Sequence, residues 1–377
     1  MTFGKMPIAN GFLKKKYFKK EYFFEMEVGF SKKVSLFQLN NHPKPKMMFN
    51  ENYPFFTGSS KGMINHFKNY AGWIKRNYLK KNYNLIEIGS NDGTFLNNFK
   101  NSKIKTLGIE PSSNVANVSK AKGIKTINNF FTYENVKKIK SLKNKTDIIC
   151  AANVVCHVPN LTDLIRGVNH LLNDNGLFIF EEPYLGSMYK KTSYDQIYDE
   201  HIFMFSVNSI KKVFKLFNFE LINVIPQKTH GGSMRYVVGR LGKHKINNNV
   251  LKLLKDEKKK KIDSIQGCLN FKKKCEISKK KLNKKVESIL KKGKNIAGYA
   301  ATSKSTTILN YCGINHKHID FICDTTPNKI NSFSPGTHIP IVSVDYYKKN
   351  IPDYTFLFAW NHKKEIFLKE KKILKKT

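Results

Sequence analysis

This 377-residue chain is short of arginine. Only four of its 67 basic residues are arginines, and these are Arg76, Arg166, Arg235 and Arg240. The formal net charge of +39 therefore comes from lysines, which are spread along the whole chain beside many asparagines. Arginine is the side chain that grips phosphate with two hydrogen bonds and reads the edges of bases. The composition thus disfavours nucleic acid as a partner, and a codon bias toward lysine and asparagine accounts for the charge.

The chain also lacks paired cysteines and long apolar runs. Its six cysteines form no C-x-x-C pair, so we expect buried thiols and assign no metal to them. No apolar run reaches the roughly 18 residues that a membrane helix needs, and the N-terminus lacks the apolar core of a signal peptide. We therefore expect a soluble, cytoplasmic protein with no membrane partner. The oligomeric state stays open, with a monomer as the expectation.

The length of the chain predicts more than one domain. From about Tyr83 to Arg240, short apolar runs alternate with helical stretches, which is typical of a parallel sheet with crossover helices. A lysine-rich stretch follows, with apolar residues at helical spacing, and then a second, smaller α/β pattern. We therefore expect an irregular N-terminal module and entry region at residues 1–66 and a first α/β domain at residues 67–245. A helical linker at residues 246–292 and a C-terminal α/β domain at residues 293–377 follow.

A glycine-containing turn follows the first apolar strand of the first domain. In "LIEIGSNDGTFL", Gly89 and Gly93 permit a tight turn and the close approach of a ligand. Glu110 ends the next predicted strand, about 20 residues later, where an acid can accept hydrogen bonds from both hydroxyls of a ribose. Taken alone, the turn is equally compatible with a plain connection between a strand and a helix.

This turn reads E-x-G-x-x-x-G and resembles the first motif of class I methyltransferases, which bind S-adenosylmethionine. The resemblance implies that Glu110 holds the ribose of the cofactor. It places the fourth strand and the following "AANVVCHVPN" beside the methyl donor. The cofactor-binding residues that it implies are Glu87, Gly89, Asn91, Gly93, Glu110 and Asn153.

Further stretches, in order along nearly the whole chain, resemble the sugar C-methyltransferases. They include "GKMPIANGFL", "ENYPFFTGSS", "YDQIYDEHIFMFS", "THGGSMRYVV", "GYAATSKSTTILNYCGI", "DTTPNK", "PGTHIPI" and "AWNHKKEI". Enzymes of that family add a methyl branch at carbon 3 of dTDP-linked 4-keto deoxysugars. The resemblance implies an α/β fold, with a class I methyltransferase (Rossmann-like) sheet followed by a smaller Rossmann-like domain that helps to hold a nucleotide-linked keto sugar.

The segment "YDEH" supplies the expected acid–base group. A ketone acidifies the proton on the neighbouring carbon, and a histidine near neutral pKa is suited to remove it. The resemblance implies that His201 is this base, with Glu200 and Tyr198 orienting it or stabilising the enolate oxygen. The alternative is a polar turn in which His201 caps a helix or packs on nearby aromatic rings. Carbon methylation by this route needs no metal.

Two other segments supply the expected substrate contacts. In "THGGSMR", Arg235 stands out in a chain with so few arginines, and a planar guanidinium suits an anionic ligand. A strand-end arginine paired with a surface carboxylate is the alternative. The second segment is "GYAATSKST", which the resemblance places against the nucleotide sugar. The substrate-binding residues expected from the two segments are His230, Gly232, Arg235, Ser303 and Lys304.

The chain departs from that family near its N-terminus. Family members typically carry a small zinc module with two pairs of cysteines, but Ser31 and Val34 stand where the second pair would fall. Neither residue replaces a thiolate, so we expect no zinc. Three alternatives to carbon methylation remain open: oxygen or nitrogen methylation of another small acceptor, a nucleic-acid-binding methyltransferase suggested by the charge, and a silent binding module suggested by the lost cysteines.

Overall fold

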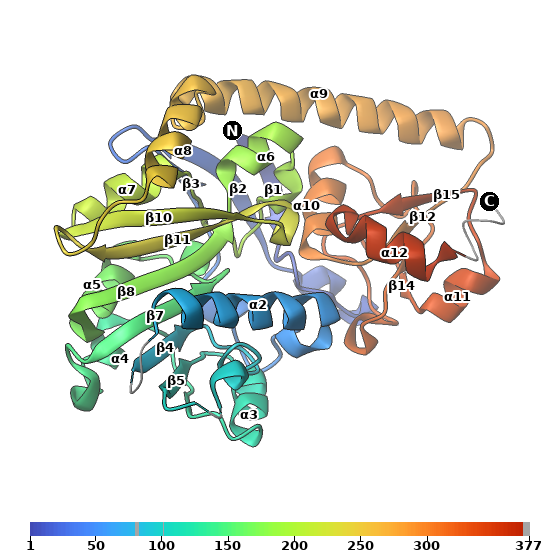
Figure 1. Ribbon diagram of the computed structural model, residues 1–377. Helices are drawn as coiled ribbons and strands as arrows, with labels where there is room; N and C mark the ends of the chain where they lie inside the picture. The colour runs from blue at the N-terminus through green and yellow to red at the C-terminus, as the bar shows by residue number, and fades with distance from the viewer. Residues whose placement is uncertain (80–82, 101, 372–377) are drawn as a thin grey trace.

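A computed structural model describes residues 1–79, 83–100 and 102–371, and its elements are arranged around three sheets (Figure 1). The largest sheet has seven strands in the order β10-β11-β8-β7-β4-β5-β6. These strands are β4 (Asn84–Ile88), β5 (Lys105–Ile109), β6 (Thr126–Ile127), β7 (Thr146–Ala152), β8 (Leu172–Pro183), β10 (Phe219–Gln227) and β11 (Ser233–Arg240).

The direction of the strands identifies the fold. The five strands from β8 to β6 pair in parallel, whereas β11 runs antiparallel to both of its neighbours. Apolar runs such as "LIEI" and "LFIF" suit strands that are covered on both faces. One reversed strand beside a parallel sheet in this order is the arrangement of class I methyltransferases, so the predicted α/β fold is confirmed.

Helices cover both faces of this sheet because alternate strand residues are apolar on both sides. One face packs on α5 (Leu161–Leu171), α7 (Val207–Lys215) and α8 (Asn248–Lys259), and the other face packs on α2 (Lys61–Asn77). The predicted domain boundary between residues 66 and 67 therefore falls inside α2. This helix belongs to the first domain from its beginning, because its apolar face covers the sheet.

The N-terminal region is not irregular, contrary to the prediction. It forms an antiparallel sheet in the order β1-β2-β3-β9, built from β1 (Thr2–Pro7), β2 (Phe23–Ser31), β3 (Leu36–Leu39) and β9 (Phe203–Met204). The last strand comes from the "YDEHIFMF" segment, and Phe37 lies opposite Met204. Local sequence does not reveal this sheet, because its fourth strand lies more than a hundred residues away.

The C-terminal lobe has a parallel sheet in the order β14-β13-β12-β15. Its strands are β12 (Ile296–Tyr299), β13 (Ile322–Cys323), β14 (Ile341–Val342) and β15 (Tyr354–Leu357). The helix α10 (Ser303–Cys312) follows β12, and α9 (Ile265–Leu290) extends from the first lobe to this one (Figure 1). The remaining α-helices are α1 (Pro45–Met48), α3 (Ser113–Ala121), α4 (Tyr133–Val136), α6 (Leu185–Lys191), α11 (Val344–Lys349) and α12 (Lys363–Lys369).

One apolar core joins the N-terminal sheet, α9 and the C-terminal lobe. Met26 and Phe37 of the N-terminal sheet, Phe271 of α9, and Leu309 and Ile322 of the C-terminal lobe all belong to it. The N-terminal sheet is therefore fixed by side-chain packing against the rest of the molecule. In the part of the chain that the structure describes, no helix has both the length and the apolar character needed to cross a membrane.

A buried acid on α8 ties two helices together. Glu257 is fully buried and accepts hydrogen bonds from the backbone amides of Val207 (2.7 Å) and Asn208 (2.9 Å) at the start of α7. It also accepts one from the hydroxyl of Tyr184 (2.8 Å). Amides at the beginning of a helix lack partners within that helix, so this carboxyl group satisfies donors that would otherwise be buried without acceptors.

We expect Glu257→Ala to lower the free energy of unfolding by about 2–4 kcal/mol, because it leaves two buried amides and one hydroxyl without acceptors. Chemical denaturation of the full chain measures this change. Glu287→Ala removes an exposed acid from α9 and is the matched control, with an expected change within about 0.5 kcal/mol. Equal effects of the two substitutions would contradict the capping role.

Candidate active site

A cavity of about 1460 Å³ lies between the two lobes. The carboxyl ends of β4, β5 and β7 form its floor, which is where α/β sheets bind ligands. Its other walls come from the residues before α2, from the "YDEH" segment and from the start of α10. The cavity thus brings together all three groups of predicted site residues.

The glycine turn forms one end of the cavity. Gly89 and Gly93 have φ angles of +65° and +75°, a region that favours glycine. A β-carbon on Gly89 would overlap the side chain of Val154, and one on Gly93 would lie 2.6 Å from Oγ of Ser119. The turn therefore requires glycine at both positions. Gly89 lines the cavity, whereas Gly93 lies behind it.

Two buried acids border this turn. The carboxyl group of Glu110 accepts hydrogen bonds from the backbone amides of Asn91 (2.9 Å) and Ser112 (2.8 Å). A carboxylate offers about four acceptor positions, so further positions remain for the two hydroxyls of a ribose. Burial, followed by the nearby Glu110 and Asp92, raises the pKa of Glu87 well above its ordinary value, and Oε2 of Glu87 is buried without a hydrogen-bond partner. A cationic, hydrogen-bonding ligand such as S-adenosylmethionine fits these two acids.

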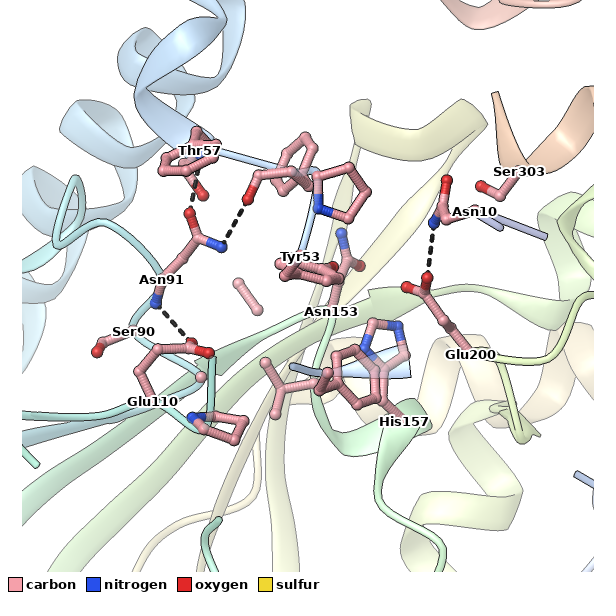
Figure 2. Close-up of a pocket in the computed structure, with 18 of the residues that line it drawn as sticks. Asn10, Tyr53, Thr57, Ser90, Asn91, Glu110, Asn153, His157, Glu200 and Ser303 are labelled. Atoms are coloured by element: carbon pink, nitrogen blue, oxygen red, sulfur yellow. Dashed lines mark hydrogen bonds between the residues drawn. The ribbon is translucent and has the colours of Figure 1, made fainter. Parts of the chain in front are cut away.

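Asn91 has a role that sequence reasoning did not foresee. Its side-chain oxygen accepts from the amide of Thr57 (2.9 Å), and its side-chain nitrogen donates to the carbonyl of Phe55 (3.1 Å), as Figure 2 shows. Asn91 therefore holds the residues before α2 over the glycine turn, rather than offering a free side chain to the cofactor. The same stretch places Tyr53 in the cavity wall.

The "YDEH" segment positions His201 at the middle of the cavity wall. Its Nδ1 lies 2.8 Å from the carbonyl oxygen of Gln196, and its Nε2 lies 2.8 Å from the hydroxyl of Tyr198. Since a carbonyl only accepts, Nδ1 carries the proton, and Nε2 accepts from Tyr198. Burial lowers the pKa of His201 to about 3, so the ring is neutral at physiological pH. The predicted base thus has an unprotonated nitrogen.

His201 belongs to a stack of rings that the sequence analysis missed. The rings of Phe49 and His157 lie 5.5 Å apart, those of His157 and His201 5.3 Å, and those of His201 and Tyr198 4.1 Å. Nε2 of His157 is buried without a hydrogen-bond partner. The quoted stretch "AANVVCHVPN" contained His157, but nothing local distinguished it from a packing residue.

Cys156, His157 and His201 place ligand atoms within 4.8 Å of one another, which is close enough to consider a metal ion. Two features disfavour one. The imidazole planes are stacked at 21°, so their in-plane lone pairs do not converge on one point. Both nitrogens of His201 already have hydrogen-bond partners. His157 and His201 are therefore members of the ring stack.

Two carboxyl groups lie side by side next to His201. Asp199 is 1% exposed and Glu200 is 4% exposed, and Glu200 lines the cavity. Burial raises the pKa of both groups, and the charge of Glu200 raises that of Asp199 further. The predicted catalytic residues Tyr198, Glu200 and His201 all reach the cavity.

His230 and Asn153 meet at the cavity wall. Both have left-handed backbone conformations, with φ angles of 51° and 54°, and their side chains are hydrogen-bonded to each other. Gly232, which we predicted to contact the substrate, does not line the cavity. Its φ of +125° and a contact of 2.5 Å between a β-carbon there and Oγ of Ser187 show that a tight turn requires the glycine.

Arg235 does not face the cavity, which contradicts its predicted role as a substrate contact. Its side chain is buried and forms an ion pair of 2.6 Å with Glu181, which also bonds to His66. The guanidinium lies over the rings of Tyr70 (4.0 Å) and Trp73 (4.4 Å). This arrangement needs a planar cation, which explains why arginine occurs here.

The C-terminal lobe contributes Ser303 and Lys304 at the start of α10, as predicted. Burial lowers the pKa of Lys304, and the nearby Asp195 opposes this effect. Asp195 accepts a hydrogen bond of 2.6 Å from the indole of Trp360. The ring of Trp360 also lies directly against Gly231, so it joins the C-terminal lobe to the first domain.

Comparisons with known proteins agree with this geometry. Residues 63–224 match the model of a methyltransferase domain, and residues 228–377 match the model of the C-methyltransferase C-terminal domain. The chain is a class I S-adenosylmethionine-dependent methyltransferase, and its C-terminal part is similar to that of C-methyltransferases. This methyltransferase is similar to the C-methyltransferase NovU of Streptomyces niveus, with 28% identity over 99% of the chain and 90% of that protein.

Solved structures of methyltransferases resemble this methyltransferase over about half its length. One is the magnesium protoporphyrin IX methyltransferase of Synechocystis with bound S-adenosylhomocysteine, at 12% identity and a TM-score of 0.38, covering 48% of this chain and 84% of that one. Another is a methyltransferase of Geobacter sulfurreducens with the same ligand, at 10% identity and a TM-score of 0.36, covering 46% and 90%. These scores are low, and the assignment as a methyltransferase rests on the two models and the curated relative.

We expect Glu110→Gln to weaken the binding of S-adenosylhomocysteine about 10- to 100-fold, because a carboxylate acceptor for the ribose hydroxyls is lost. Isothermal titration calorimetry measures the affinity. Glu134→Gln changes an exposed acid on α4 and is the control. Equal affinities of the wild type and Glu110→Gln would mean that Glu110 does not hold the ribose.

We expect Arg235→Met to lower the free energy of unfolding by about 3 kcal/mol, because it leaves the buried carboxylate of Glu181 without its cation. Denaturation with urea measures the change, and Arg76→Met at an exposed position of α2 is the control. If the free energy of unfolding fell by less than about 1 kcal/mol, as is usual for an exposed ion pair, the pair of Arg235 and Glu181 would contribute no more than a surface contact.

Proposed function

We propose that this methyltransferase adds a methyl branch to the carbon beside the keto group of a nucleotide-linked deoxysugar, with His201 as the base. The hydrogen bonds of His201 carry this proposal. Because Nδ1 donates to the carbonyl of Gln196, Nε2 is the unprotonated nitrogen. In the free site Nε2 accepts from the hydroxyl of Tyr198, and this hydroxyl would turn toward the substrate oxygen when Nε2 takes the carbon-bound proton. The C-methyltransferase model and the relative NovU favour carbon as the methylated atom.

The residues divide the reaction as follows. Nε2 of His201 takes the proton from the carbon next to the ketone, and the electron pair moves onto the ketone oxygen to give an enolate. The negative enolate beside the ring favours the protonated imidazole, which offsets the low pKa of His201 in the free site. The enolate carbon would then form the new carbon–carbon bond to the methyl group while the carbon–sulfur bond of the donor breaks, its electron pair staying on sulfur as a neutral thioether. The proton on His201 leaves to solvent. Tyr198 would donate its hydroxyl to the developing oxygen charge, and Glu200 lies on the wall of the same cavity.

The donor end of the cavity belongs to Glu87, Gly89 and Glu110. When bound there, S-adenosylmethionine supplies an electrophilic methyl group. Glu110 would hold the ribose, and the unpartnered oxygen of Glu87 would receive a donor from the methionine part. Asn153 lines the cavity beside this end and orients His230 toward the reaction centre.

The other end of the cavity suits an anionic sugar nucleotide. Ser303 lies at the first turn of α10, where backbone amides favour anions, and Lys304 follows it. Lys329 also lines this end, and its amino group donates 2.7 Å to the carbonyl of Ala301. Burial lowers the pKa of both lysines, so a diphosphate between them would restore the charged form that burial disfavours.

Deuterium exchange tests the role of His201 apart from methyl transfer. In deuterated water with S-adenosylhomocysteine, we expect the wild type to exchange the proton on the carbon beside the ketone of a dTDP-4-keto-6-deoxysugar. His201→Asn should slow this exchange at least about 100-fold, because the base is lost. Mass spectrometry measures the deuterium content of the sugar.

His170→Asn is the control, since His170 on α5 does not line the cavity. Exchange at the wild-type rate in His201→Asn would show that another group is the base. Methylation of oxygen or nitrogen, without any exchange at carbon by the wild type, would favour the alternative acceptor class.

A further inference from the structure

Asn10 reaches the active site from outside the methyltransferase domain. It follows β1, in a turn that is closed by a hydrogen bond of 2.9 Å from the amide of Gly11 to the carbonyl of Ile8. Its side-chain Nδ2 donates a hydrogen bond of 2.6 Å to Oε1 of Glu200, 190 residues later in the chain. Figure 2 shows the two side chains facing each other, and both line the cavity.

The backbone beside Asn10 is fixed on two sides. The amide of Ala9 donates 3.0 Å to Oδ1 of Asp199, and its carbonyl accepts 2.9 Å from the hydroxyl of Thr306 on α10. Ala9, Asp199 and Thr306 are all at most 2% exposed. The turn after β1 is therefore held between the "YDEH" segment and the C-terminal lobe, so the amide of Asn10 has little freedom to move away from Glu200.

The two neighbouring carboxyl groups receive different donors. Asp199 has one backbone amide on Oδ1, and its Oδ2 is buried with no hydrogen-bond partner, which favours a protonated Asp199. Glu200 has the Asn10 amide, and this bond, followed by one from Tyr53, favours its ionised form and lowers its pKa against the effect of burial. The titratable groups that face Glu200 are Tyr53, Cys156, Tyr198, Asp199 and His201.

We propose that Asn10 is a positioning residue of the methyl transfer: its amide occupies one oxygen of Glu200 and aims the other at the substrate. The inference rests on the proposed function in one respect, namely that Glu200 acts on the acceptor. It assigns to the turn after β1 an indirect part in the reaction, since this turn carries the donor to Glu200. Asn10 does not itself act on the reacting atoms.

The test compares Asn10→Ala with Asn40→Ala in the full chain. Asn40 belongs to the same N-terminal region and makes a similar bond of 3.1 Å to Glu27, but at an exposed position away from the cavity. Infrared difference spectroscopy follows the titration of the Glu200 carboxyl band, which Glu200→Gln identifies. We expect Asn10→Ala to raise the pKa of Glu200 by about one unit, as loss of a bond to a charged group predicts.

In kinetic assays, we expect Asn10→Ala to lower kcat about tenfold, to leave KM for S-adenosylmethionine unchanged and to move the pH limb of Glu200 upward. A purely structural role would lower activity equally at every pH. Should Asn10→Ala not fold, Asn10→Leu gives the same decision, because it keeps about the same side-chain size and removes the donor without adding a charge.

An unchanged titration of Glu200 in the Asn10 variant, or an equal shift in Asn40→Ala, overturns the proposal. The titration does not depend on the identity of the sugar. If the pKa of Glu200 moves as expected while the wild type methylates no keto sugar, the contact stands and the proposed function fails.

Discussion

The active site depends on the burial of two adjacent carboxyl groups, Asp199 and Glu200. Removing a carboxylate from water is costly unless hydrogen-bond donors replace the water. The donors come from Ala9 and Asn10, which lie far away in sequence. Pairing of β9 with β3 brings these parts of the chain together, because β9 follows the "YDEH" segment directly. The turn after β1 thus reaches the cavity through Asn10, and the packing of the N-terminal sheet on α9 and the C-terminal lobe holds the "YDEH" segment in place.

The acidic and basic residues of the cavity lie at opposite ends. Acids lie at the end that borders the glycine turn, and partly buried lysines lie at the end formed by α10 and the residues after β13. Neither group is well satisfied in the free protein, since burial shifts the pKa of Glu87 upward and the pKa of Lys304 downward. A bound cation beside Glu87 and a bound anion beside Lys304 would each favour the charged form of that side chain. This division supports the proposed pairing of a sulfonium donor with a sugar nucleotide, which would bind on opposite sides of the neutral His201.

The sequence was sufficient for features that depend on local pattern. The strand–glycine–helix turn and Glu110 follow from short-range rules, and the alternation of strands and helices gives the sheet. His157 and Asn10 were not identified, because their roles arise from contacts with distant parts of the chain. Arg235 was assigned to the substrate because arginine is scarce here. Scarcity shows only that a planar cation is needed, and a stack on Tyr70 and Trp73 with Glu181 needs one equally.

The positions of the two tryptophans give the molecule built-in optical probes. The chain contains only Trp73 and Trp360. Trp73, on α2, lies beside the guanidinium of Arg235. The indole of Trp360 instead donates a hydrogen bond to Asp195 where the lobes meet. The fluorescence of Trp360, seen alone after Trp73→Phe, therefore reports on the junction between the lobes. In the single variant Trp360→Phe, the fluorescence of Trp73 instead reports on the packing of α2 against the sheet. The two regions can therefore be followed separately without an attached dye.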